Sequence, residues 1–301
     1  MSTAVAAGPL PGVVGGFSGW ALSTEPVLAT GPGDAAVIVR TPRGPADLVP
    51  GGSARDLAAA AASRIGVGPA VVGTDPVTGA VALEHLDTPW QVATLGRLVA
   101  YGAVGALGAA RSAFRDADVE LPDRDVVADV RALRQRAEGL GWRPVDEVTR
   151  LLDLVEPVAA AVAGGPAARA SWGAADVSSV LVHPSGAVRL VGGTFAGRTD
   201  PLADLGALVA ELCPFVADPT EIVVAGWGSA APGVLARVHL HGFLDDVRQA
   251  LWSLVVGLVA GRPGDDHGSY TGYRLRRAAY AAHGTGQFDT WLRQAADGWE
   301  G

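Results

Sequence analysis

Residues 180–191 read VLVHPSGAVRLV, and residues 195–205 read FAGRTDPLADL. In the first stretch, two short apolar runs flank the turn-forming residues His-Pro-Ser-Gly, which predicts a β-hairpin. In the second stretch, Asp200 and Asp204 accompany the start of a helical pattern over residues 202–212. After residue 88 this is the only β-like pattern, so we expect one hairpin set among helices in that part of the chain.

Short β-type runs separated by Gly and Pro turns characterise residues 12–88. They occur at residues 13–14, 35–39, 71–72 and 80–83, and an Ala-rich helical pattern over residues 53–65 interrupts them. Helical patterns then follow at residues 91–112, 124–138, 145–163, 202–212, 231–259, 269–282 and 286–297. The composition changes near residues 86–90, so we expect a sheet lobe with one helix over residues 1–87 and a helical lobe over residues 88–301, an α+β organisation.

The predicted hairpin and its Asp-Pro-x-x-Asp-Leu continuation resemble the catalytic hairpin of aminoglycoside phosphotransferases and choline kinase-like enzymes. Residues 15–19, which read GGFSG, are similar to the nucleotide loop of that family. The resemblance implies nucleotide-cleft or ligand-cleft positions at Gly15, Gly16, Ser18, Arg40 and Glu84. It covers residues from about 12 to about 282, and it implies a two-lobe protein-kinase-like fold with a small antiparallel sheet and a mostly helical second lobe.

Phosphoryl transfer needs a base that orients the acceptor hydroxyl and side chains that hold a metal ion. The resemblance places Trp172 at the family's His, Ala174 at its catalytic Asp, Ser179 at its Asn and Gly192 at its metal-binding Asp. The chain has no Lys and no Asn, so compositional drift explains the serine, yet Asp is used freely elsewhere. Losing both aspartates indicates that catalysis has been lost, and the resemblance therefore implies a pseudokinase rather than an active enzyme.

Five further side chains leave alternatives open. Asp176 is either a relocated general base or a solvated loop residue. Arg40 either clamps a phosphate or forms a surface ion pair. Trp172 either fills the space that phosphates or acceptor normally occupy, or packs beneath the loop. Asp200 and Asp204 belong to the Asp-Pro-x-x-Asp-Leu motif, and we interpret this pair as structural because in the family it braces the loop after the metal-binding Asp.

The sequence does not predict a metal site. His239 and His241 are two residues apart within a helical pattern, so they point in different directions and do not converge on one ion. Cys213 is the only cysteine, which excludes an internal disulfide and a zinc site built from several thiolates.

Composition and charge limit the partners. With 49% hydrophobic residues the 301-residue chain can bury a substantial core. The net charge of −8 argues against nucleic acid and anionic membranes, because both require a Lys/Arg surface. Residues 1–16 show no signal-peptide pattern, and the longest apolar stretch, residues 251–260, is too short to span a bilayer. We therefore expect a cytoplasmic protein whose partner is another protein or a small molecule.

Three functional hypotheses follow. The first is a catalytically inactive binding or regulatory module of the phosphotransferase fold. The second is a small-molecule phosphotransferase, or an enzyme of different chemistry, that uses Asp176 as a relocated base. The third is a ligand-binding protein that presents a substrate to another enzyme. We predict weak or no ATP binding and no Mg²⁺, because the acidic metal ligands of the family are missing.

Overall fold

The computed structural model describes residues 8–9, 24–30, 36–42, 52–75, 80–117, 119–173, 177–193, 195–213, 218–260 and 266–297. The chain forms two compact units. Unit 1 contains Met1–Pro122 and Trp172–Gly197, and unit 2 contains Asp123–Ser171 and Arg198–Gly301. The hairpin at residues 180–191 therefore belongs to the same unit as the N-terminal sheet. The lobe boundary expected between residues 87 and 88 stays a prediction.

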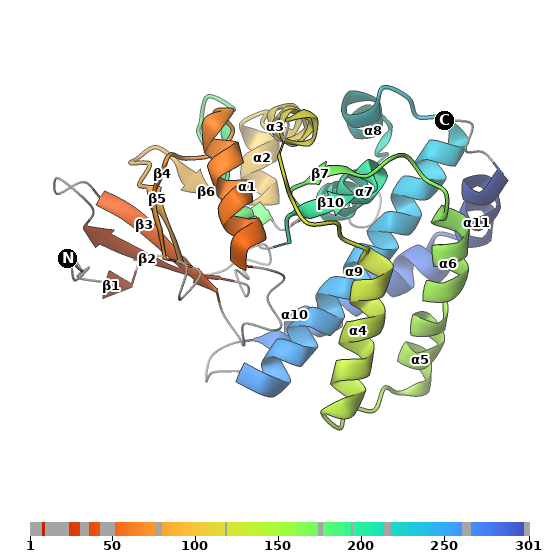
Figure 1. Cartoon of the computed structure of the whole chain (residues 1–301). Coiled ribbons are helices and arrows are strands. Elements are labelled where there is room, and N and C mark those ends of the chain that lie inside the picture. Colours follow the sequence, from red (N-terminus) through yellow and green to blue (C-terminus); the bar gives the residue numbers. More distant parts are fainter. Residues whose placement is uncertain are drawn as a thin grey trace. The chain divides into compact units, whose positions relative to one another are not determined.

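Unit 1 is built on a five-stranded antiparallel sheet in the order β1-β2-β3-β5-β4 (Figure 1). Its strands are β1 (Gly8–Pro9), β2 (Thr24–Thr30), β3 (Ala36–Pro42), β4 (Val71–Asp75) and β5 (Ala80–Glu84). The strands predicted at residues 35–39, 71–72 and 80–83 are confirmed, whereas the run at residues 13–14 lies outside the described residues. Sequence patterning did not predict β2, because Pro26 interrupts it opposite Arg40 of β3 and proline is unfavourable within a strand.

Helix α1 (Gly52–Arg64) accompanies this sheet, as the Ala-rich pattern predicts. Ala58 and Ala62 are completely buried on one side of the helix. Ala59 packs in a small apolar cluster with Val81 and Leu83 of β5 and with Val191. Alanine allows close approach here, since a Cβ placed on Gly68 would lie only 2.9 Å from the Cβ of Ala62.

A second, three-stranded sheet of unit 1 has the order β6-β8-β9 and contains the predicted hairpin. Its strands are β6 (Gln91–Val92), β8 (Val180–Val182) and β9 (Val188–Leu190), and β8 is preceded by the short 3₁₀ turn η2 (Val177–Ser179). The predicted helix over residues 91–112 is wrong at its start. Residues 91–92 pair with β8, and the helical part divides into α2 (Leu95–Ala100) and α3 (Val104–Asp116) around Gly102, whose φ is +62°.

Unit 2 is mostly helical and is organised around the 29-residue helix α9 (Pro232–Ala260). Helices α4 (Val126–Gly139), α6 (Val155–Val162), α7 (Pro201–Leu212), α10 (His267–Ala279) and α11 (Phe288–Asp297) all contact α9 (Figure 1). Shorter elements are α5 (Asp146–Asp153), α8 (Thr220–Trp227), the π-helical segment η3 (Tyr280–Gly284), and the paired strands β7 (Arg169–Ser171) and β10 (Gly197–Thr199). The predicted helix over residues 145–163 breaks at Leu154 into α5 and α6, and α8 was not predicted.

Two kinds of contact hold unit 2 together. Phe243, Leu240 and Val247 of α9 lie in an apolar core that α4, α6, α10 and α11 share. A buried ionic network also joins three helices: Arg274 and Arg277 of α10 contact both Asp246 of α9 and Glu211 of α7, at distances between 2.8 and 3.2 Å.

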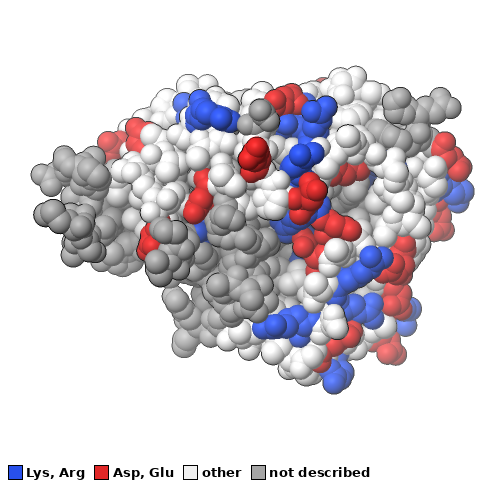
Figure 2. All heavy atoms as spheres, in the orientation of Figure 1, with Lys and Arg blue, Asp and Glu red and all other residues white. Residues whose placement is uncertain are grey.

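Charged side chains of both signs are intermixed on the face of the molecule seen in Figure 2. Among the described residues, no helix has the length and apolar character that crossing a membrane would require. The expected cytoplasmic location stays a prediction.

Candidate functional site

Trp172, which the resemblance places at the family's His, directly follows β7. Its indole is 1% exposed and meets Phe114 of α3 edge to face, with ring centroids 5.1 Å apart. On another side, a Cβ placed on Gly193 would lie 3.3 Å from the indole Cη2. The indole Nε1 has no hydrogen-bond partner among the described residues. These are the contacts of a core residue held between α3 and the chain at Gly193.

Ser179 and Gly192 lie near each other at the base of the hairpin. Ser179 ends η2 and is buried, and its carbonyl oxygen accepts a hydrogen bond of 2.8 Å from the backbone N–H of Val191. Gly192 follows with a φ of +108° and Gly193 with a φ of +61°. A residue with a side chain is strained at such angles. An aspartate at residue 192 would therefore require a different backbone from the one present.

Several predicted positions lie outside the described residues, namely Gly15, Gly16, Ser18, Ala174 and Asp176. Arg40 is described through its backbone alone, which pairs with Val81 of β5. Glu84 ends β5, and its exposed carboxylate accepts a 3.3 Å hydrogen bond from the backbone N–H of Ala70. The structure thus brings Trp172, Ser179 and Gly192 together in unit 1.

Asp200 and Asp204 both act on the framework of unit 2. Asp200 caps the N-terminus of α7, since its Oδ1 accepts a 2.8 Å hydrogen bond from the backbone N–H of Leu202. Its Oδ2 lies 3.3 Å from Nε2 of His241 on α9. Asp204 accepts a 2.7 Å hydrogen bond from the hydroxyl of Ser171 at the end of β7. These contacts fix the start of α7 against α9 and β7; the structural role expected of the pair stays a prediction.

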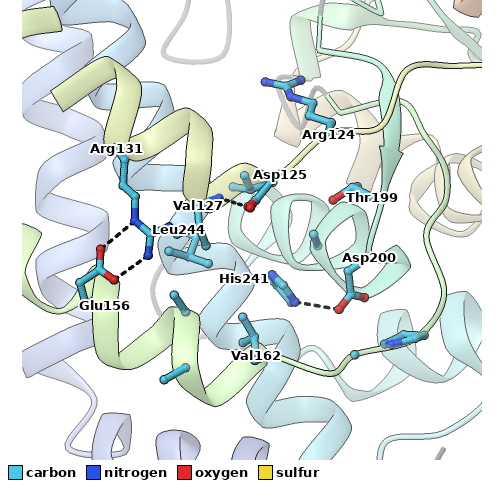
Figure 3. Close-up of a pocket in the computed structure, with 17 residues that line it drawn as sticks. Arg124, Asp125, Val127, Arg131, Glu156, Val162, Thr199, Asp200, His241 and Leu244 are labelled. Carbon is cyan, nitrogen blue, oxygen red and sulfur yellow. Dashed lines mark hydrogen bonds and ion pairs between the residues drawn. The ribbon is translucent and has the colours of Figure 1, made fainter. Parts of the chain in front are cut away.

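A cavity of about 610 Å³ opens beside Asp200 in unit 2. Figure 3 shows Asp125, Thr199, Asp200 and His241 around it. Four parts of the chain line the cavity: the start of α4, the end of α6 with residues 163–166, the junction of β10 and α7, and the middle of α9. Because these parts are far apart in the sequence, sequence patterns did not reveal the cavity.

The arginines of the cavity are already paired. Arg124 lies 2.7 Å from Asp129 through its Nε, and burial together with the nearby Arg248 lowers the pKa of Arg124 to about 10. Arg131 and Glu156 form a two-point pair at 2.9 and 2.6 Å, visible as two dashed lines in Figure 3. The hydrogen bonds from Arg131 lower the pKa of the exposed Glu156 carboxyl.

Two carboxylates of the cavity, Asp125 and Asp200, act as helix caps. Asp125 caps α4, because its Oδ1 accepts hydrogen bonds from Val127 at 2.8 Å and Ala128 at 3.2 Å. Asp200 caps α7 in the same manner and reaches His241. His241 is 6% exposed, and its Nδ1 has no hydrogen-bond partner within the described parts of the chain. The cavity therefore presents the carboxylates of Asp125 and Asp200 to a ligand.

The other histidine of the His-x-His pair faces elsewhere. His239 stacks on Trp291 of α11 with ring centroids 4.3 Å apart, and burial lowers its pKa. The described residues contain no cluster of three or more His, Cys, Asp or Glu side chains that could hold a metal ion.

Similar proteins are found by comparing structures and not by comparing sequences. No protein-family model matches the sequence, and no curated protein matches it. Among solved structures, a choline/ethanolamine kinase family protein from Mesorhizobium loti matches with a TM-score of 0.76 and 21% identity, over 96% of this chain and 92% of that one.

Two other solved structures also match. The choline kinase LicA from Streptococcus pneumoniae gives a TM-score of 0.69 and 15% identity over 89% of this chain and 91% of its own. The GDP complex of aminoglycoside 2'-phosphotransferase-IIIa gives a TM-score of 0.58 and 14% identity over 86% of this chain and 89% of its own. The fold is that of choline kinases and aminoglycoside phosphotransferases. This confirms the predicted α+β protein-kinase-like fold.

Proposed function

We propose that this chain is a catalytically inactive protein of the choline kinase and aminoglycoside phosphotransferase fold, a pseudokinase that serves as a ligand-binding or regulatory module. The observation that carries the proposal is the packing of Trp172. A fully buried indole, locked against Phe114, occupies the position at which the resemblance expects a small polar imidazole.

The neighbouring positions support the proposal. Ser179 has no carboxylate to offer to a metal ion, and Gly192 has no side chain at all. Metal ions bridging the phosphates neutralise charge in the transition state, and a positioned base contributes a rate factor of about 10² to 10⁴. A chain without these groups is expected to lack ordinary kinase activity.

The cavity of unit 2 is the proposed ligand site. Its arginines are paired, and Asp125 and Asp200 line it as helix caps, with Arg131 near Asp125 and with His241 and Arg237 near Asp200. A small ligand bearing an ammonium group suits this site, because the two carboxylates supply acceptors and negative charge. Such a ligand would be bound and not phosphorylated.

Activity is tested with ATP and Mg²⁺ together with choline, ethanolamine or kanamycin as acceptor. We expect no phosphotransfer, and turnover near 1 s⁻¹, which is in the range of kinases, would refute the proposal. Asp176→Ala serves as a control for any residual activity, because loss of that activity would assign the chemistry to a relocated base.

Ligand binding is tested by calorimetric titration with choline and kanamycin. Asp125→Asn is the sharpest variant, because asparagine caps helices about as well as aspartate but carries no charge. We expect unchanged thermal stability and at least about fivefold weaker binding of the cation, roughly the effect of one nearby charge. Equal affinity of the variant and the wild type would place the ligand elsewhere.

A further inference from the structure

Arg55 is a buried cation without a hydrogen-bond partner among the described residues. It lies in the first turn of α1, and its side chain is 1% exposed. None of its three guanidinium nitrogens has a hydrogen-bond partner within the described residues. The one acid within ion-pair range is the adjacent Asp56, whose Oδ1 lies 3.9 Å from Nη2, beyond hydrogen-bonding distance.

Leaving a charge in this state is costly. An ion removed from water without compensating hydrogen bonds loses several kcal/mol of solvation. Consecutive helical residues do not face each other, so Asp56 is poorly placed to compensate for the charge. Burial lowers the pKa of Arg55, and the charge of the adjacent Asp56 opposes this shift only in part. A group this unfavourable to the fold calls for a ligand that completes it.

The position of Arg55 shows where that ligand would bind. Arg55 precedes Ala58 by three residues and Ala59 by four, so all three share one face of α1. A Cβ built on Gly193 would lie 3.2 Å from the Cβ of Ala58, so Ala58 lies against Gly193. Ala59 packs with Val191. The face of α1 that carries Arg55 is therefore the face packed on residues 191–193.

The charge at this place is the reverse of that in a metal-dependent kinase. The resemblance expects an aspartate at Gly192 that holds a cation over the phosphates. The chain instead has no side chain there and a fixed guanidinium on the adjoining helix. The first turn of α1 adds backbone N–H groups and the positive end of the helix dipole, and it contains no acidic residue; Asp56 follows directly after it.

We propose that Arg55 and the first turn of α1 bind a phosphate-type oxyanion directly, without a divalent metal ion. Guanidinium suits this task, because its planar donors hold phosphate in a two-point contact. The inference rests on the proposed function, since it assumes that the phosphate is held and not transferred. It assigns a ligand class to unit 1 that differs from the cation proposed for the cavity of unit 2.

The test measures the thermal unfolding temperature and calorimetric affinity with pyrophosphate and with ADP, both in EDTA. We expect pyrophosphate to stabilise the wild-type protein without Mg²⁺. Arg55→Met should weaken its binding by about 10- to 100-fold, the range for hydrogen bonds to a charged group. Arg55→Lys should retain part of the affinity. Arg64→Met, at the exposed far end of the same helix, is the matched control and should bind as the wild type does.

Stability without a ligand gives a second readout. If Arg55 is an uncompensated cation, Arg55→Met should unfold at a temperature equal to or higher than the wild type. A lower unfolding temperature would mean that the guanidinium already has its partner in the fold, and the inference would be overturned.

The binding measurements with pyrophosphate and ADP test the inference and identify the carrier of the phosphate. Undiminished pyrophosphate binding by Arg55→Met, or no binding by the wild type, would also overturn the inference. Tighter binding of ADP than of pyrophosphate would identify a nucleotide as the carrier of the phosphate, and equal binding would identify a free phosphate. Phosphotransfer activity would refute the proposed function separately, whatever the result in EDTA.

Discussion

Replacing Trp172 by alanine should destabilise unit 1 severely. Deleting a fully buried tryptophan or phenylalanine side chain costs about 3–5 kcal/mol, and an edge-to-face pair adds about 0.5–1.5 kcal/mol. Since Trp172 is 1% exposed and forms such a pair with Phe114, we expect a loss of about 4–6 kcal/mol in the free energy of unfolding. This is comparable to the whole stability of many domains, about 5–15 kcal/mol.

Trp172→Phe is the informative companion variant. It preserves an aromatic ring against Phe114 and removes the indole N–H, which has no hydrogen-bond partner in the described structure. We expect Trp172→Phe to lower the free energy of unfolding by less than half as much as Trp172→Ala does. The phenylalanine creates a smaller cavity and removes one unsatisfied buried donor. Urea unfolding followed by far-UV circular dichroism measures both variants against the wild type.

The same pair of variants tests the reasoning behind the pseudokinase proposal. If Trp172→Ala lost less than about 1 kcal/mol, the indole would not be a core residue and the packing argument would be refuted. If the alanine variant stayed folded and gained Mg²⁺-dependent ATP affinity, the indole would be blocking a competent nucleotide cleft instead.

Three other predictions concern unit 2. Asp246→Ala should lose about 3–5 kcal/mol in urea unfolding, because Arg274 and Arg277 would keep their buried charges with one carboxylate fewer. Asp200→Ala should lose about 1–2 kcal/mol by the same assay through the helix cap, whereas Asp200→Asn should lose less than half of that. Although burial opposes them, the two arginines lower the pKa of Glu211, so its ionised form stabilises the fold above its ordinary pKa of about 4.3. The stability difference between wild type and Glu211→Gln should therefore shrink as the pH falls below about 4, and a difference that is constant from pH 6 to pH 3 would contradict this.

Much of the fold was predictable because local patterns and tertiary structure agree. The hairpin around His183 and Gly186 has the turn residues and flanking apolar runs that predicted it, and in it Val182 pairs with Val188. The long helix α9 is apolar enough to be recognised in isolation. Predictions failed where a local signal was weak: Pro26 concealed β2, and a helical pattern concealed the pairing of Gln91 with β8.

The candidate sites were harder to predict. The positions that the resemblance gives to Ser179 and Gly192 follow from aligning the hairpin. The cavity beside Asp125 does not, because its walls come from four separate parts of the chain, although an aspartate just before an apolar helical run was a usable capping signal. No sequence pattern indicated that Arg55 is buried. Arginine is rarely fully buried, so an arginine in an Ala-rich helix is expected at the surface.

The backbone at Gly192 also has an evolutionary consequence. At a φ of +108° a side chain adds strain of about 1–3 kcal/mol, whereas glycine tolerates this conformation at no steric cost. Under the proposed function, an aspartate could therefore be introduced at residue 192 only together with substitutions that reshape the neighbouring chain. Gain of a metal ligand by one codon change would then be unfavourable.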